Sequence, residues 1–96
     1  MGFLVLYKFL FMGNIGSRIR PLREFLNLGR AEFADLTEIK KDTLIKIERG
    51  RQRPTEELIE GIGKHWPEYL HWLITGTANP DLGQTSPEIE ELRRSG

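Results

Sequence analysis

The sequence predicts an all-α fold, a compact bundle of five helices with a short C-terminal helix or tail. Five successive segments carry apolar residues three, four or seven positions apart, which is the spacing of one buried helix face. Residues that cap helices precede these segments, and Gly or Asn follows most of them. We find no pattern of paired strands and no internal repeat, and 96 residues suit a single domain.

The first helix is expected to begin at Ser17, whose hydroxyl can cap it. Pro21 should lie in its first turn or mark its start, because proline lacks the N–H that a helix interior uses. Asn27 should end the helix, since Asn tolerates the left-handed conformation of a helix stop. The buried stripe of this helix comprises Ile19, Leu22 and Leu26.

Two further short helices are expected over residues 30–37 and about 41–49. Gly29 stands at the cap of the first, and Gly50 should end the second. Their inward-facing residues are Phe33, Ala34, Leu44 and Ile47.

The fourth helix is expected to start at Thr55, a capping residue followed by two acids, and to stop at Gly63. A fifth helix should begin at Pro67 and close at Gly76. A polar loop follows, and Ser86 begins a brief last helix. The apolar residues of the fourth and fifth helices are Leu58, Ile59, Ile62, Tyr69, Leu70, Trp72, Leu73 and Ile74.

Residues 1–14 form an apolar N-terminal extension whose role stays open. It is too short to span a bilayer, which needs about 20 residues, and Lys8 interrupts it. No small-residue cleavage site follows, so the segment does not look like a secretory signal. Three interpretations remain: no role, with Met12 as the natural start; an arm that contacts a second copy; or an arm that touches a membrane.

The chain has no net charge, but its charges are unevenly distributed. Residues 15–54 hold ten Lys/Arg and six Asp/Glu, whereas residues 55–96 hold three and eight. This asymmetry indicates a basic half that faces a polyanion, although chance could also produce it. The chain has no cysteine and two histidines, which excludes disulfides and thiolate metal sites and makes a zinc site implausible. We expect no cofactor and no metal, and a reducing, cytoplasmic setting fits.

Residues 28–50 carry the most informative pattern. Two helices cross at a steep angle only if the residue at their crossing is small, and Ala34 is that residue. The short turn between them needs one inward apolar group, which Ile39 supplies. The second helix then buries Leu44 and Ile47 and turns its other face outward. Such an arrangement presents a helix to the major groove of DNA.

On these features the sequence resembles the Cro/CI-type, lambda-repressor-like helix-turn-helix regulators, and small prophage repressors are the nearest kind. The resemblance implies a helix-turn-helix DNA-binding domain over residues 15–77. It leaves residues 78–96 as a loop and short C-terminal helix, which is either a dimerisation tail or a disordered terminus. Dimer contacts are expected from the fifth helix, from the tail over residues 86–94, or from both. The matching residues are Arg18, Ile19, Leu26, Ala34, Ile39, Leu44, Ile47, Glu48, Arg49, Gly50, Leu58, Ile59, Ile62, Gly63 and residues 71–77.

The sequence departs from this family at three positions of the motif. The family usually has Ser or Thr at Gly29, Gln at Arg30 and Gly at Glu38. Arg30 can still reach a phosphate. Glu38 needs a turn without the usual glycine, which leaves the angle between the two helices open.

The resemblance also implies an ion pair within the fold and a set of side chains that contact DNA. Arg23 and Glu48 are expected to meet as an ion pair that links the first helix to the end of the third and fixes its orientation. The alternative is that the charged residues only solvate their helix surfaces. Base edges would be read by Lys41, Asp42, Ile45 and Lys46. Phosphates would be bound by Arg18, Arg30, Lys40, Thr43, Arg51 and Arg53.

These expectations describe a sequence-specific transcriptional repressor of phage or prophage type that binds inverted-repeat operators in double-stranded DNA as a homodimer. It would act at the nucleoid, without a membrane, under the control of its abundance, a partner or an antirepressor. The competing hypothesis is an antitoxin or adaptor that keeps the fold as a protein-interaction module, with a toxin as partner. No catalytic arrangement stands out, so we do not expect an enzyme.

Overall fold

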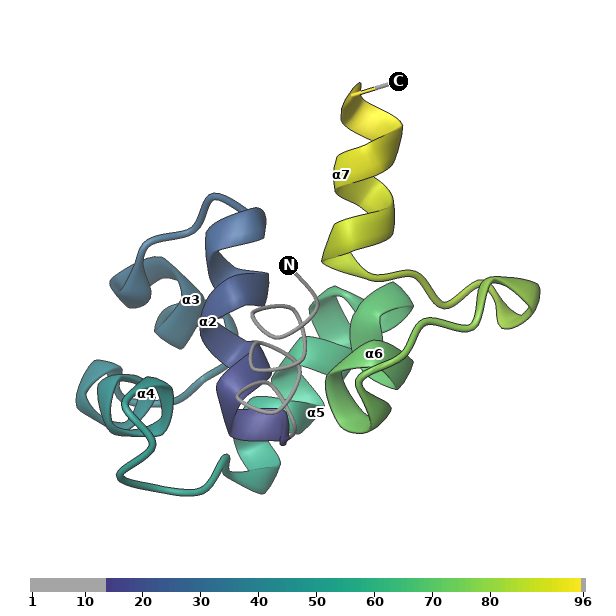
Figure 1. Ribbon diagram of the computed structural model, residues 1–96. Coiled ribbons are helices and arrows are strands. Elements are labelled where there is room, and N and C mark those ends of the chain that lie inside the picture. Colours follow the sequence, from purple (N-terminus) through teal and green to yellow (C-terminus); the bar gives the residue numbers. More distant parts are fainter. Residues whose placement is uncertain (1–13, 96) are drawn as a thin grey trace, which may run out of the picture.

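A computed structural model describes residues 14–95, which fold into helices joined by short loops (Figure 1). The α-helices are α2 (Ile15–Phe25), α3 (Arg30–Leu36), α4 (Lys41–Glu48), α5 (Glu56–His65), α6 (Leu70–Thr75) and α7 (Pro87–Ser95). Two 3-10 turns are η1 (Pro67–Tyr69) and η2 (Pro80–Leu82). The prediction of an all-α fold is confirmed. An isolated antiparallel bridge between Asn79 and Gln84 lies in the segment expected to be a polar loop. The interpretations of the N-terminal extension fall on residues outside the described range, except Asn14.

The start of α2 differs from the prediction, because Asn14 and not Ser17 is the N-cap. Asn14 Oδ1 accepts a hydrogen bond from the Ser17 backbone N–H at 3.0 Å, and the Asn14 N–H donates to Ser17 Oγ at 3.4 Å. This reciprocal capping box moves the helix start three residues earlier. Pro21 therefore lies inside α2 rather than in its first turn.

Three of the predicted helix stops adopt the left-handed conformation, with φ of 58° at Asn27, 74° at Gly50 and 84° at Gly76. The predicted stop at Gly63 is wrong, since α5 continues to His65. At Gly63 a Cβ would lie 3.4 Å from a methyl group of Leu70, which is an ordinary contact, so the space there does not require a glycine. The predicted N-cap Thr55 is confirmed by its side chain, which accepts from the Leu58 N–H at 3.2 Å.

The core gathers around α2, with α3 and α4 on one side of that helix and α5 and α6 on the other (Figure 1). Phe33 and Trp66 stack with their ring centroids 5.4 Å apart. Ile74, expected among the apolar residues of the fifth helix, lies exposed instead. The buried apolar residues are Ile19, Leu22, Phe33, Ala34, Leu44, Ile47, Leu58, Ile62, Tyr69, Trp72 and Leu73.

Helix α7 stands away from the bundle, on the side opposite α3 and α4 (Figure 1). Near its end the Arg94 guanidinium lies 4.4 Å from the centroid of the Phe25 ring, and at its start the Ser86 hydroxyl accepts from the Ile89 N–H at 3.2 Å. The predicted last helix is thus present and touches α2. No helix within residues 14–95 is long and apolar enough to cross a membrane.

Two glycines of α5 offer a matched test of this packing. A Cβ on Gly61 would lie 2.8 Å from Thr37 Cα and 2.9 Å from Thr37 Cβ, so Gly61→Ala should destabilise the fold by about 1–3 kcal/mol. Gly63→Ala should stabilise it by up to about 1 kcal/mol, because its contact is ordinary and Ala favours helix. Urea unfolding measures both variants. Equal effects would mean that α5 does not lie against the turn as described.

Candidate nucleic-acid interface

The turn between α3 and α4 holds the two helices at a fixed angle. Thr37 ends α3, and its hydroxyl donates to the Phe33 carbonyl at 2.7 Å. Glu38 follows with φ of 59°, a left-handed conformation that costs a residue with a side chain about 1–2 kcal/mol. The Ile39 N–H then donates to the Ala34 carbonyl at 3.0 Å. The turn therefore forms with Glu38 where the resembling family usually has glycine.

Helix α4 buries one face and exposes the other. Leu44 and Ile47 lie in the core. The four residues predicted to read bases all lie on the other face, where Ile45 is half-buried and the exposed members are Lys41, Asp42 and Lys46. A helix with this exposure can enter a groove without unfolding any part of its own domain.

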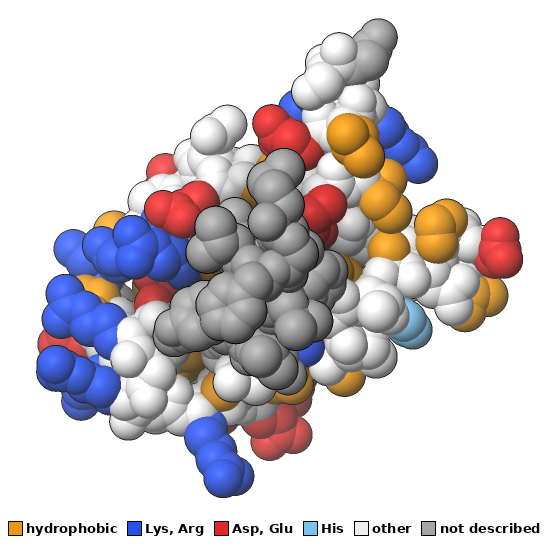
Figure 2. Space-filling model, in the orientation of Figure 1, with side chains coloured by type: hydrophobic (Ala, Val, Ile, Leu, Met, Phe, Trp, Pro, Cys, Tyr) orange, Lys and Arg blue, Asp and Glu red, His pale blue; other side chains and the backbone are white. Residues whose placement is uncertain are grey.

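Six cations lie on this helix or in the segments that directly precede and follow it, and we call them the basic face: Lys40, Lys41, Lys46, Arg49, Arg51 and Arg53. All six are exposed, and the same stretch of chain contains two acids, Asp42 and Glu48. In Figure 2 the largest group of blue side chains lies on the side of α3 and α4, and further blue side chains lie on α7. The uneven charge of the sequence is therefore also uneven in space.

Arg49 belongs to this surface, although the sequence interpretation did not assign it a DNA contact. It borders a small surface depression with Asp42, Ile45, Lys46 and Arg51. Its spacing of one helical turn after Ile45 is the signal that could have identified it.

The Arg23 and Glu48 side chains meet as an ion pair between α2 and the end of α4. Arg23 Nε lies 2.7 Å from Glu48 Oε2, and Arg23 Nη2 lies 3.2 Å from Oε1. Arg23 Nη1 donates to the Leu28 carbonyl at 3.0 Å. The hydrogen bond to Glu48 raises the pKa of Arg23, against the opposing effect of burial. Two parallel hydrogen bonds fix the direction of both side chains.

Arg30, predicted to bind a phosphate, also touches Glu48. Its Nε lies 3.2 Å from Glu48 Oε1, and its side chain is 36% exposed. Glu48 thus receives hydrogen bonds from two arginines, and its own side chain is 2% exposed.

Arg18 lies elsewhere, and its assignment to a phosphate needs correction. The side chain is buried, and Nη1 donates to the Leu73 carbonyl of α6 at 3.2 Å. Burial lowers the pKa of this guanidinium. A Cβ on Gly76 would lie 2.9 Å from Arg18 Nη2, so the end of α6 closes directly over the group. Arg18 cannot reach a phosphate outside the protein and instead links α2 to α6.

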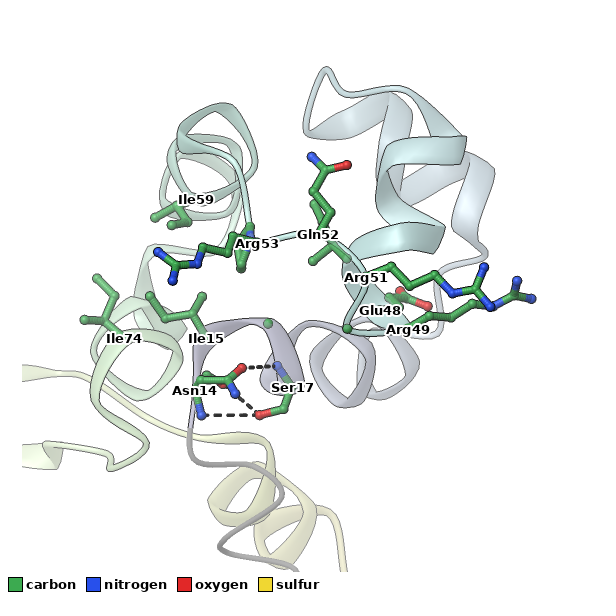
Figure 3. A pocket seen from close by; sticks show the side chains of 14 residues that line it. Asn14, Ile15, Ser17, Glu48, Arg49, Arg51, Gln52, Arg53, Ile59 and Ile74 are labelled. Carbon is green, nitrogen blue, oxygen red and sulfur yellow. Dashed lines mark hydrogen bonds between the residues drawn. The ribbon is translucent and has the colours of Figure 1, made fainter.

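A groove of about 960 Å³ borders the basic face. Its lining combines the start of α2, the end of α4, the loop to α5, and one residue each of α5 and α6. Figure 3 shows Ile15, Ile59 and Ile74 around the Arg53 side chain, with Glu48, Arg49 and Arg51 at the other end. Among residues 14–95 no group of three or more acidic, His or Cys side chains could hold a metal ion.

Comparison with known proteins shows one matching family and one similar repressor. The helix-turn-helix domain family matches residues 14–65, from the N-cap of α2 to the last residue of α5 and more than half of the chain. The chain is also similar to Repressor protein C of Escherichia phage P2, with 30% identity over 78 residues that cover 79% of each chain.

Removing the Glu48 carboxylate should loosen the fold. Glu48→Ala leaves Arg23 buried without its counter-charge, and a broken buried pair costs about 3–5 kcal/mol. The control is Glu24→Ala, which removes an exposed pair with Arg20 at 3.5 Å and should cost no more than about 1 kcal/mol. Thermal unfolding measures both, and an unchanged melting temperature for Glu48→Ala would refute the structural role of the pair.

Proposed function

The chain belongs to the helix-turn-helix family as a regulator of the Cro/CI type, and from this we propose that it is a sequence-specific DNA-binding repressor that binds inverted-repeat operators as a dimer. The observation that carries the proposal is the exposed side of α4, flanked by the basic face. The name of its phage P2 relative, a repressor, supports repression as the outcome of binding.

Base recognition is assigned to the exposed side of α4. Lys41 and Lys46 can donate to guanine O6 or N7, and Asp42 can accept from cytosine N4. Ile45 offers a methyl-rich surface to thymine. These donors, acceptors and apolar atoms lie on one helix face, so they can meet adjacent base pairs of one major groove.

Phosphate binding is assigned to the cations around that helix. Lys40 stands at the N-cap of α4, and Arg51 and Arg53 follow its C-terminal end, so cations lie near both ends of the helix. Thr43 is half-buried and offers a hydroxyl, and Arg49 joins the set. Each neutralised phosphate releases counterions, so affinity should fall steeply with salt.

Dimerisation is assigned to the C-terminal segment, residues 78–95. Leu82 is 71% exposed and Leu92 is 73% exposed, both well above the other exposed large apolar residues of the described chain. Figure 2 shows orange side chains along α7 and the loop before it. One helix covers only about 4–5 base pairs, so two copies with half-sites about 34 Å apart would supply the affinity that a single copy lacks.

Selection of bound sites from random duplexes tests the operator and the division of roles among the cations. The wild type should select an inverted repeat with half-sites about one helical turn apart. Lys46→Ala should relax preference at one base pair of each half-site, whereas Arg53→Ala should weaken all sequences alike and reduce the salt slope by about one. If both variants behaved identically, the assignment of base and phosphate contacts would be wrong, and absence of binding at low salt would favour the adaptor hypothesis.

Exposed leucines of the tail test the dimer. Leu82→Asn combined with Leu92→Asn should weaken self-association by at least about a hundredfold, because burying each leucine contributes about 1.5–3 kcal/mol. Sedimentation equilibrium measures the association constant. Leu36→Asn is the control, since Leu36 is 40% exposed on α3 and should leave the constant unchanged. A dimer that survives the double substitution would place the interface elsewhere.

A further inference from the structure

The fold does not need the contact between Glu48 and Arg30 to neutralise the Glu48 carboxylate. Arg23 alone already gives the Glu48 carboxylate a two-point hydrogen bond, at 2.7 and 3.2 Å, and a full counter-charge. Arg30 adds a third contact at 3.2 Å to the same carboxylate. The cluster of two arginines and one glutamate therefore carries a net charge of one positive unit.

That surplus charge lies at the surface. Arg23 and Glu48 are enclosed, whereas the Arg30 side chain is 36% exposed at the first residue of α3. Arg30 uses only its Nε toward Glu48, and within residues 14–95 its two terminal nitrogens make no hydrogen bond. These nitrogens carry four N–H groups in a fixed plane, which is the geometry that binds two phosphate oxygens.

The position of the cluster places this charge beside the DNA-binding helix. Glu48 is the last residue of α4, and Arg49, which follows it, belongs to the basic face. A hydrogen bond from Nε to a buried carboxylate restricts the rotation of a long side chain. It thereby removes part of the entropy cost of ordering that side chain on a ligand.

We infer that Glu48 is a positioning residue that holds the Arg30 guanidinium with its two terminal nitrogens directed at a DNA phosphate. Glu48 thus has two roles, one toward Arg23 in the fold and one toward Arg30 in binding. The inference rests on the proposed DNA-binding function and adds a residue that acts through another at the same interface.

Three substitutions at Arg30 separate charge from position. The probe is a fluorescent 24-base-pair duplex of random sequence, because a phosphate contact is independent of sequence. Arg30→Gln should weaken binding about tenfold and reduce the salt slope by about one. Arg30→Lys should keep the salt slope but still lose several-fold in affinity, because lysine has the charge without the Nε contact and the planar fork. Arg30→Ala should resemble Arg30→Gln.

Arg20→Gln is the matched control. Arg20 also pairs with a glutamate, Glu24 at 3.5 Å, but that pair is exposed on α2 and its carboxylate contacts no other arginine. Its loss should change neither the slope nor the affinity beyond the effect of one distant charge. Circular dichroism at the assay temperature verifies that every variant is folded.

Glu48→Gln completes a double-mutant cycle. If Glu48 positions Arg30, the change in log affinity caused by Arg30→Gln should be about half as large or less when Glu48→Gln is also present. If Glu48→Gln does not fold, the comparison of Arg30→Lys with the wild type still decides the question. Equal affinity of Arg30→Lys and wild type, or an unchanged slope for Arg30→Gln, overturns the inference while leaving the proposed function standing. A wild type that binds no duplex at low salt overturns both.

Discussion

The Glu48 carboxylate joins the three helices on which the interface depends. It accepts hydrogen bonds from Arg23 of α2 and Arg30 of α3, and it sits on the last residue of α4. Taking a carboxylate out of water is costly, and apolar residues of the same volume often stabilise a fold as well. The gain of such a cluster is geometric. A planar guanidinium group can hydrogen-bond a carboxylate through two N–H groups in only a few orientations. The end of α4 therefore has a defined direction relative to the other two helices.

The separation of positive and negative charge decides which side of this protein attracts a polyanion such as DNA. The chain as a whole is neutral, yet six of its fourteen Lys and Arg residues form the basic face, and eight of its fourteen acids lie in residues 55–96. A neutral protein with this dipole is attracted to a polyanion with one side only. In the proposed complex the acidic half, which includes α7, would face away from the duplex.

The sequence predicts those parts of the fold that depend on one residue and its neighbours. Asn27, Gly50 and Gly76 follow the ends of their helices as expected, because the left-handed conformation strongly favours Asn and Gly. The start of α2 was placed wrongly since Asn14 and Ser17 are both good caps, and the reciprocal bond between them appears only in three dimensions. Gly63 lies inside α5 at a place where packing does not require a glycine, so a glycine alone does not mark the end of a helix.

In the candidate site, too, local sequence predicts some residues, whereas the placement of others depends on how the helices pack. Helical spacing was enough to place Lys41, Asp42 and Lys46 on one exposed face. It could not show that Arg18 turns inward toward α6, because an arginine one position before a buried isoleucine is compatible with either direction. The double use of Glu48 also escaped prediction, since Arg30 is 18 residues away and its direction depends on how α3 crosses α4.

The close approach of Gly61 to Thr37 has a consequence for how a duplex is engaged. The Gly61 backbone of α5 lies so close to Thr37 that a methyl group on Gly61 would fall within 3.0 Å of both the Cα and the Cβ of Thr37. A contact this close leaves little room for α5 to shift toward the α3–α4 turn. In the proposed complex, adjustment during docking would then fall on the DNA, and the bending and twisting preferences of base steps without protein contacts would contribute to discrimination.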